Sequence, residues 1–316
     1  MKKLKSYIVG GHRFCVSMDL KSVLWEGMGN YEPFLSEEFN IEPDTSCADI
    51  LHNSVFCVDI DLSSDGKDII SSSRTLADFD DDTAYISVMS GVGGERIFLI
   101  SLNSRMKDRC GLLVVDKDLS KCKLYAGACA TGGHGLFVVN NAIMLLYALC
   151  TSVMNTLLIH ASVAVADCLG YAFLGKSGTG KSTHTRLWLQ NITGACLLND
   201  DNPVVRINER GETMIYGSPW SGKTPCYRNE SVPLKAVVRL SQAPYNSIRK
   251  LSGVSAYAAV APSASSMKWE SSMADGLHDT LSKLISNVSI YHLECLPDAD
   301  AAFLCHDTQN REFFYF

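Results

Sequence analysis

The chain has 316 residues, of which 47% are hydrophobic and 20% are charged, and its formal net charge is −6 at pH 7. This length and composition are typical of a folded protein with one or two domains and a sizeable buried core. The acidic balance, with no Lys/Arg-rich run beyond the first five residues, argues against binding to nucleic acid.

The twelve cysteines are scattered along the chain. None forms a Cys-x-x-Cys pair or clusters with histidine, and several lie in apolar runs, as Cys150 does. A small disulfide scaffold would be short and loop-rich, and a zinc site would show paired spacing. The pattern therefore favours reduced thiols, and we expect a cytoplasmic protein.

Two segments are candidates for membrane insertion. Residues 6–13 follow three lysines but are too short and polar for the core of a signal peptide. The apolar run 142–154 is shorter than the roughly 20 residues that a transmembrane helix needs. We therefore expect no membrane association and interpret this run as part of a buried helix over about 138–155.

The first third of the sequence favours strands. Short apolar or alternating runs are separated by turn-forming clusters such as Ser63–Gly66 and Ser90–Gly94. We expect an α+β (α/β) protein with an antiparallel, strand-rich amino-terminal domain over residues 1–130 and a second domain over residues 131–316. The expected strands of the first domain cover residues 14–18, 55–62, 83–89, 95–102, 111–115 and 121–125.

Two polar features of this part have simple interpretations. An acidic cluster contains Asp78, Asp80, Asp81 and Asp82. Such a cluster could hold a divalent ion, but a solvated loop explains it without further assumptions. The glycine-rich residues 127–135 lack the preceding strand and the lysine of a phosphate-binding loop, so we interpret them as the linker between the two domains.

The most informative region begins at residue 157. Residues 157–166 form an apolar run that predicts a buried strand, residues 167–170 predict a turn, and residues 171–174 predict the returning strand. The next eight residues, 175–182, read Gly-Lys-Ser-Gly-Thr-Gly-Lys-Ser and match the pattern GxxxxGK[ST] in full. The residues that follow resemble the start of a helix, which is the context that this motif requires.

This motif predicts a site for ATP or GTP. Glycines allow backbone N–H groups to turn toward phosphate oxygens, and the helix amino terminus adds a partial positive charge. Lys181 would contact the β- and γ-phosphates, and the Ser182 hydroxyl would help to hold Mg²⁺. The predicted nucleotide-binding residues are Gly175, Lys176, Ser177, Gly178, Thr179, Gly180, Lys181, Ser182 and Thr183.

A second group of residues predicts the reaction. Asp200 and Asp201 end a short apolar strand, where an acidic residue would face the phosphate loop across a metal ion. Adjacent carboxylates can divide their roles, with one orienting the metal and the other accepting a proton from a hydroxyl. His160 lies on the hairpin partner of the strand that leads into the loop, so its imidazole could lie beside the γ-phosphate.

These residues, in this order, resemble the catalytic domain of HPr kinase/phosphorylase and, more broadly, the phosphoenolpyruvate-carboxykinase-like P-loop fold. HPr-kinase-related proteins found near peptide-modification genes are similar as well. The resemblance covers about residues 137–304. It is carried by Leu158–Ser162, Gly175–Thr183, Gly217–Lys223 and Val232–Lys235.

The resemblance implies a phosphate loop between strands of a small mixed sheet. It implies Asp200 as the general base on a serine hydroxyl, Asp201 as a metal ligand together with Ser182, and His160 as a contact of the transferred phosphate. The chain departs from HPr kinase at Lys176, where the kinases usually carry Asp, and it lacks a good match to their downstream glycine-rich signature.

Further basic residues are candidates for contacts with phosphate or acceptor. Lys223, in the stretch Gly217–Lys223, could clamp a phosphate or the acceptor, although this stretch could equally be a structural turn. Arg228 and Arg239 could stabilise transition-state charge, and the sequence does not choose between them. Arg186 is interpreted as a surface residue of the helix that follows the loop.

The remaining chain reads as supporting structure. We expect helices over residues 246–261 and 267–288, a strand over 289–296 and a helical tail over 298–306. We expect a Mg²⁺-dependent kinase that transfers the nucleotide γ-phosphate to a hydroxyl, serine above all, of a protein or peptide. A nucleotide-binding scaffold without turnover and a small-molecule phosphotransferase are the alternatives. The sequence does not identify the acceptor or show whether a reverse phosphorylase activity exists. It also leaves the oligomeric state open, and a homo-oligomer is one of the alternatives.

Overall fold

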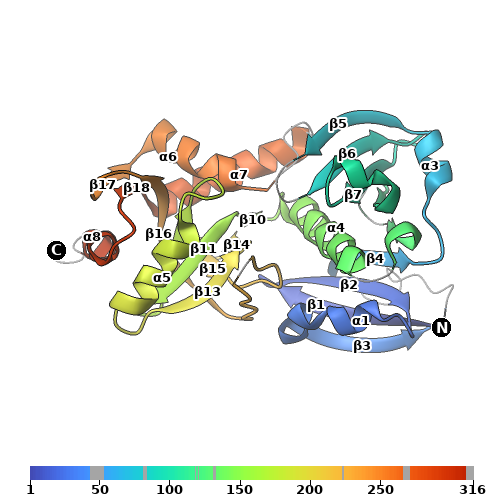
Figure 1. Cartoon of the computed structure of the whole chain (residues 1–316), viewed down its shortest axis with the longest axis horizontal. Helices are drawn as coiled ribbons and strands as arrows, with labels where there is room; N and C mark the ends of the chain where they lie inside the picture. Colours follow the sequence, from blue (N-terminus) through green and yellow to red (C-terminus); the bar gives the residue numbers. More distant parts are fainter. Residues whose placement is uncertain are drawn as a thin grey trace. The chain divides into compact units, whose positions relative to one another are not determined.

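The computed structural model describes residues 1–42, 53–80, 84–117, 119, 121–130, 133–222, 224–265 and 271–310. The chain divides into two compact units, Met1–Cys150 and Thr151–Phe316, whose elements are labelled in Figure 1. Each unit is built on a mixed β-sheet with helices, and the first unit is rich in strands, which confirms the expected α+β class.

Unit 1 contains a sheet of order β3-β1-β2-β4-β9-β8-β7-β6-β5. Its neighbouring strands are antiparallel except for the pairs β2–β4 and β4–β9, which are parallel, so the sheet is mixed and not wholly antiparallel as we expected. Its strands are β1 Lys2–Val9, β2 His12–Asp19, β3 Leu35–Ile41, β4 Ser54–Asp61, β5 Arg74–Asp80, β6 Tyr85–Ser90, β7 Arg96–Ser101, β8 Gly111–Val115 and β9 Cys122–Tyr125. Its short helices are α1 Leu24–Gly27, η1 Gly29–Phe34, α3 Lys67–Ser71, η2 Ser104–Arg109 and η3 Gly127–Cys129.

The acidic cluster of unit 1 lies partly in this sheet. Asp78 belongs to β5 and accepts a hydrogen bond of 2.7 Å from the Tyr85 hydroxyl of β6. Hydrogen bonds from Ser87 and Tyr85 also lower the pKa of the Asp78 carboxyl group. Asp81 and Asp82 lie outside the described residues. For Asp78, the structure therefore shows a cross-strand contact and not the loop position that we expected.

Helix α4, Gly133–Thr151, closes unit 1 and contains most of the apolar run. Its Tyr147 hydroxyl donates a hydrogen bond of 2.9 Å to the Val9 carbonyl oxygen of β1, and Val138 and Val139 are buried. Among the described residues, α4 is the helix long and apolar enough to cross a membrane, and 56% of its apolar window is buried. The packing of α4 explains why unit 1 ends at Cys150, whereas the sequence places the boundary after residue 130.

Unit 2 contains a second mixed sheet, of order β10-β14-β15-β16-β12-β11-β13, with β18 beside β16 and β17 beside β18. The pairs β12–β16 and β16–β18 are parallel, and the other pairs are antiparallel. Its strands are β10 Thr156–Leu158, β11 Ala161–Ala166, β12 Leu169–Leu174, β13 Cys196–Asp201, β14 Val204–Ile207, β15 Thr213–Tyr216, β16 Ser231–Gln242, β17 Ser247–Leu251 and β18 Ser289–Cys295.

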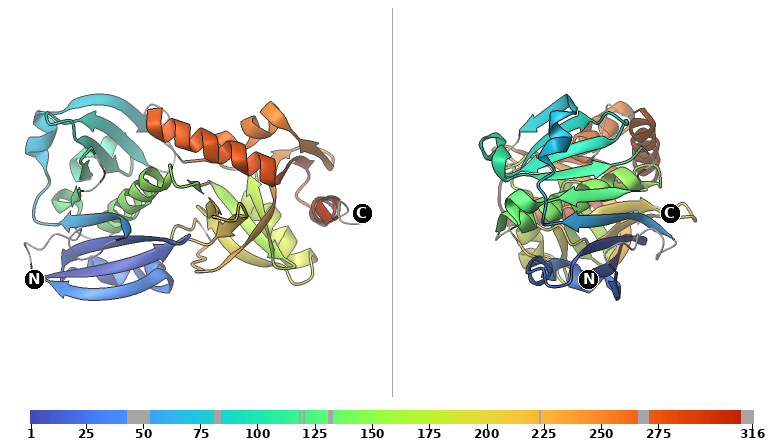
Figure 2. Two further views of the ribbon diagram at one scale, coloured as in Figure 1. Left: turned by 180° about the vertical axis from the view of Figure 1, so that it is seen from behind. Right: turned by 90° about the vertical axis from the view of Figure 1, so that its right-hand side faces the viewer.

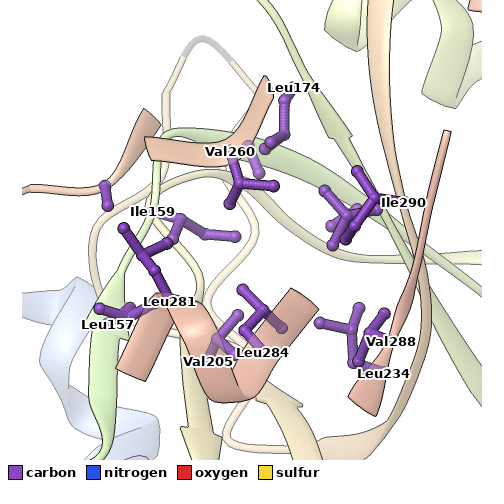
Figure 3. Packing of buried hydrophobic residues seen from close by; sticks show 14 of the residues in the cluster. Leu157, Ile159, Leu174, Val205, Leu234, Val260, Leu281, Leu284, Val288 and Ile290 are labelled. Carbon is purple, nitrogen blue, oxygen red and sulfur yellow. The ribbon is translucent and has the colours of Figure 1, made fainter. Parts of the chain in front are cut away.

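Helices cover the two faces of this sheet. On one face, α5 (Lys181–Asn191) and α8 (Ala299–Asn310) pack against a core that includes Trp188, Phe173 and Tyr291. On the other face lie α6 (Gly253–Val260), the short η4 (Ala261–Ser263) and α7 (Ser271–Asn287). Figure 2 shows α7 along this face from behind. Figure 3 shows the apolar core of this face, including Val260 of α6 and Leu281 and Leu284 of α7.

The carboxyl-terminal part differs from the sequence expectation at one element. Residues 246–261 contain strand β17 and only then helix α6, and not one helix as we expected. Strand β17 pairs with β18 because Ile248 and Leu251 contribute to the buried cores while Arg249 and Lys250 are exposed. The helix at 271–287, the strand at 289–295 and the terminal helix at 299–310 are confirmed.

Candidate functional site

The phosphate-loop motif lies between β12 and α5, after a tight hairpin. Strands β11 and β12 pair from Ala161↔Leu174 to Ala166↔Leu169, which leaves Asp167 and Cys168 as a two-residue turn. Both turn residues have positive φ, 51° and 61°, as a hairpin with the right-handed twist of strands requires. The sequence prediction of a hairpin that leads into the loop is confirmed. The strand predicted over residues 157–166 is divided, however, because β10 ends at Leu158 and β11 begins at Ala161, so His160 lies between the two strands.

Two glycines give the loop its curvature. Gly178 and Gly180 have φ of 79° and 102°, which residues with a Cβ adopt only at a cost. The Lys176 carbonyl oxygen accepts hydrogen bonds from the Thr179 backbone N–H at 3.1 Å and from its hydroxyl at 2.8 Å. Gln242 of β16 donates a bond of 3.3 Å to the Gly178 carbonyl. The loop is thus held in a tight curve at the amino terminus of α5, where phosphate is favoured.

Lys181 begins α5, and its ammonium group crosses the loop. The Nζ atom donates a hydrogen bond of 2.9 Å to the Gly175 carbonyl oxygen. Burial lowers the pKa of this ammonium group, and the nearby Asp201 and Asp200 carboxylates oppose the shift. Lys181 is therefore a half-buried cation near two carboxylates, those of Asp201 and Asp200. A bound polyphosphate would offset the cost of its burial.

Ser182 contacts one of the two predicted carboxylates. Its hydroxyl donates a hydrogen bond of 3.0 Å to Asp200 Oδ1, and Asp200 is buried with 5% exposure. This contact arises because β13 lies beside β11, with Asp200 opposite Ser162. Ser162 in turn accepts a bond of 2.7 Å from the Thr185 hydroxyl of α5, which ties the helix to this side of the sheet.

Asp201 points to a different partner. Its Oδ1 atom lies 2.9 Å from His160 Nδ1, and its Oδ2 atom accepts a bond of 2.9 Å from the Asn202 amide. His160 is fixed by its backbone, because its N–H donates to the Ser263 carbonyl at 2.7 Å. Successive strand residues face opposite sides of a sheet. Asp200 and Asp201 therefore serve two different neighbours, Ser182 and His160.

A loop from Ser218 to Gly222 covers the backbone of the Asp pair. Gly222 donates its N–H to the Asp200 carbonyl, and Asp201 forms an isolated bridge with Ser221. A Cβ at Gly222 would lie 3.1 Å from the Asp200 carbonyl oxygen, so the close approach favours glycine. The sequence singles out this stretch, although Lys223, its predicted clamp, lies outside the described residues.

A buried histidine, His184, lies in the first turn of α5, directly after the phosphate loop. His184 accepts a hydrogen bond of 3.2 Å from the Trp188 indole N–H and packs edge-on against Phe173. Burial lowers the pKa of His184 to about 4, so the ring is neutral near pH 7. This contact fixes the first turn of α5 beneath the phosphate loop, and the sequence analysis did not single it out. Its signal was the i, i+4 spacing of His and Trp on one helix face.

The remaining predicted residues have less specific surroundings. Lys176 and Ser177 are exposed at the tip of the loop, and Thr183 lies half-buried in the first turn of α5. Arg186 is exposed, as predicted. Arg228 bonds to the Leu197 carbonyl at 2.8 Å and pairs with Glu230 at 2.8 Å. Arg228 therefore makes a structural contact with β13 and an ion pair with Glu230.

The residues of the site fit a magnesium ion held jointly with phosphate. Within the described part of the chain, no three His, Cys, Asp or Glu side chains cluster as a self-sufficient metal site. The Ser182 hydroxyl and the Asp200 carboxylate, 3.0 Å apart, offer the oxygen ligands that Mg²⁺ prefers. Mg²⁺ commonly keeps several waters and is bound by one or two protein oxygens plus substrate phosphates, so this small ligand set is sufficient.

Comparison with known proteins adds little to this geometry. No model of a known protein family matches the chain, and no curated protein matches its sequence. Among solved structures, the chain is similar to the Hpr(Ser) kinase/phosphatase from Coxiella burnetii, with a TM-score of 0.29 and 12% identity over 49% of this chain and 95% of that chain. Similarity at this level does not show a family, so the function is argued from the residues of the site.

Proposed function

We propose that the protein is a Mg²⁺-dependent P-loop kinase that transfers the γ-phosphate of ATP or GTP to a hydroxyl group, serine above all, of a protein or peptide. The observation that carries the proposal is the pair of contacts Ser182–Asp200 and His160–Asp201 at the end of the phosphate loop. Binding of a nucleotide alone would need the loop and Lys181 only. The second carboxylate, Asp201, which contacts His160, could in addition accept a proton from the acceptor hydroxyl.

The nucleotide would be held mainly by the loop. The N–H groups around Gly178 and Gly180 and the amino terminus of α5 favour the phosphate oxygens, and Lys181 adds a positive charge within reach of them. Thr179 and Gln242 hold the loop in this shape through bonds to the Lys176 and Gly178 carbonyls. A site prepared in this way loses little energy to reorganisation when phosphate binds.

The two carboxylates would divide the work, in the reverse of the order that the resemblance implies. Asp200 lies beside Ser182, so these two residues would hold Mg²⁺, which supplies compensation for charge on the β- and γ-phosphate oxygens. Asp201 lies on the His160 side, so Asp201 would accept the proton of the acceptor hydroxyl. His160 would orient the Asp201 carboxylate, since its own backbone is bonded to Ser263.

The proposal is tested by following labelled γ-phosphate. The purified protein is incubated with γ-labelled ATP and Mg²⁺, with and without a serine-peptide library, and phosphoserine is identified by mass spectrometry. We expect labelled peptide with the natural chain and at least about 100-fold less with Asp201→Asn. Label on a small metabolite, or nucleotide binding without any transfer, would instead indicate the phosphotransferase or the scaffold alternative.

A further inference from the structure

Four strands of the unit 2 sheet end at the edge where the phosphate loop lies. Strands β12 and β13 are each antiparallel to β11, and β16 and β18 run parallel to β12, so the carboxyl ends of all four share this edge. Their order along the edge is β13, β12, β16 and β18, with β11 between the first two. Figure 1 shows β16, β17 and β18 side by side in this unit. In open α/β sheets, ligands bind outside the carboxyl ends of the strands.

This order of strands gives a bound nucleotide a direction. The Asp pair ends β13 on one side of the loop, and Ser182 contacts Asp200 there. The proposed metal ion and the reacting γ-phosphate would therefore lie on the β13 side. The nucleoside is the opposite end of a nucleoside triphosphate, so it is expected on the other side of the loop, over the ends of β16 and β18.

Strand β16 contacts the loop on that other side. Gln242, the last residue of β16, donates a hydrogen bond of 3.3 Å from its side-chain amide to the Gly178 carbonyl oxygen, and both residues are exposed. The Leu240 carbonyl oxygen lies 3.5 Å from the position that a Cβ on Gly175 would occupy. An exposed surface therefore continues from the loop onto the end of β16.

The turn between β16 and β17 presents an aromatic ring beside Gln242. Tyr245 is 52% exposed, and its hydroxyl donates a hydrogen bond of 3.4 Å to Glu294 Oε1 of β18. Two further apolar residues, Pro244 of the same turn and Leu296 directly after β18, are exposed as well. A nucleotide base has a π-face that stacks on an aromatic side chain of this kind.

Side-chain hydrogen bonds fix this turn to the segment that follows β18. Asn246 Oδ1 accepts a bond of 2.8 Å from the Leu296 backbone N–H, and the Asn246 amide donates a bond of 3.0 Å to Asp298 Oδ1. The same oxygen of Asp298 accepts a bond of 2.9 Å from the Ala301 N–H in the first turn of α8. Residues 243–246 and 296–298 thus form one ordered surface, which we call the platform. Binding to an ordered surface avoids the cost of ordering it.

We propose that the purine base of the nucleotide lies on this platform with its ring stacked on Tyr245. Neighbouring strands lie about 4.8 Å apart, so β18 is about 10 Å from β12, a distance that the ribose and the α-phosphate can bridge. Tyr245 would then hold the nucleoside, whereas the loop and Lys181 hold the phosphates. This inference deepens the proposed function and rests on its assignment of the loop to a nucleoside triphosphate.

The test separates the nucleoside from the phosphates. Calorimetric titrations measure the affinity of the whole protein for MgATP, for MgGTP and for magnesium tripolyphosphate, which has three phosphates and no nucleoside. The variants are Tyr245→Ala, Tyr245→Phe and, as a control, Leu189→Ala. Leu189 is also an exposed apolar residue, but it lies in the last turn of α5, away from the loop.

We expect Tyr245→Ala to weaken binding of the preferred nucleotide by at least about fivefold, because one base–aromatic stack is lost. Its affinity for tripolyphosphate should not change, since the loop and Lys181 are intact. Tyr245→Phe keeps the ring and should keep the affinity for the nucleotide, and Leu189→Ala should bind all three compounds as the natural chain does. Because Tyr245 is exposed, its replacement does not threaten the fold.

A second measurement locates the base without a substitution. Derivatives of ATP and GTP that carry an azide on the purine ring are photolysed with the natural chain, and the labelled peptides are identified by mass spectrometry. We expect label within the platform, at residues 243–246 or 296–298, and loss of this label when unmodified nucleotide is added in excess. Label confined to other parts of the chain would contradict the platform.

Two titration results would overturn the inference: equal affinity of the natural chain and Tyr245→Ala for the nucleotide, or an equal loss of affinity for nucleotide and tripolyphosphate. The second result would mean that Tyr245 acts on the phosphate loop. Nucleotide binding that depends on Tyr245, without transfer of phosphate to the peptide library, would support the platform and contradict the proposed kinase. Phosphate transfer together with unchanged affinity in Tyr245→Ala would do the reverse. Absence of binding to all three compounds would contradict both.

Discussion

Replacing Asp201 with asparagine tests the division of roles between the two carboxylates. The change preserves the shape of the side chain and its contact with Asn202 but removes the proton acceptor. His160 and Asp201 are 40% and 34% exposed, so their pair contributes at most about 1 kcal/mol to stability. In a unit of this size such a loss lowers the melting temperature by only about 2–4 °C. The variant is therefore expected to be folded.

The expected loss lies in the chemical step. A positioned general base typically contributes about 10²–10⁴-fold, which corresponds to about 3–5 kcal/mol of transition-state stabilisation. Asp201→Asn should lower kcat by this factor, measured as ADP formation from MgATP with the peptide acceptor. Its affinity for MgATP should change less than about threefold, because the carboxylate beside Ser182 is Asp200. Calorimetric titration with MgATP measures that affinity.

Asp200→Asn is the matched variant. We expect it to weaken both affinity for MgATP and the response to added Mg²⁺, since the amide would replace the buried carboxylate beside Ser182. If Asp201→Asn retained kcat within about threefold while Asp200→Asn lost it without losing affinity, the reasoning from these contacts would be refuted. The order of roles implied by the sequence resemblance would then hold.

Other predictions concern the metal and the hairpin. Ser182→Ala should raise the Mg²⁺ concentration needed for half-maximal activity by about tenfold, since it removes a hydroxyl ligand; an unchanged Mg²⁺ titration would exclude Ser182 from the metal site. Gly222→Ala should lower kcat, because its Cβ would lie 3.2 Å from Asp201 Cβ and displace the Asp pair; full activity would show that the loop can yield. Cys168→Gly should raise the unfolding free energy by up to about 1 kcal/mol, because φ is 61° there and relief of a left-handed conformation that costs about 1–2 kcal/mol exceeds the added unfolded-state freedom of glycine, about 0.5–1 kcal/mol; lower stability in urea titration would contradict this.

Local sequence patterns predicted the elements that lie next to each other in the chain. The hairpin, the loop and α5 follow one another within residues 161–191, and each has a direct signal in turn residues, glycines or apolar spacing. Most strands of unit 1 were predicted for the same reason. Strands β1, β3 and β5 were not predicted. The lysines of β1 were considered only as the positive flank of a signal-peptide candidate, whereas Lys2, Lys3 and Lys5 pair with Asp59, Glu38 and Glu32.

The arrangement of the site depended on contacts between distant residues. Asp200 and Asp201 are adjacent in the sequence, and only the pairing of β13 with β11 decides which of them faces Ser182. Arg239, His292 and Arg249 are likewise brought side by side by the pairing of β16, β18 and β17. Strand β17 had been predicted as helix, so this group could not be assembled from the sequence.

The central claim is that the loop binds the phosphates of a nucleotide through Lys181. The most direct measurement is a calorimetric titration of MgATP into the natural chain and into Lys181→Ala, with folding of both checked by circular dichroism. Lys181 lies across the loop, 2.9 Å from the Gly175 carbonyl, and we expect its loss to weaken MgATP binding by at least about tenfold. Equal affinity of the two proteins, or no binding by the natural chain, would contradict the account.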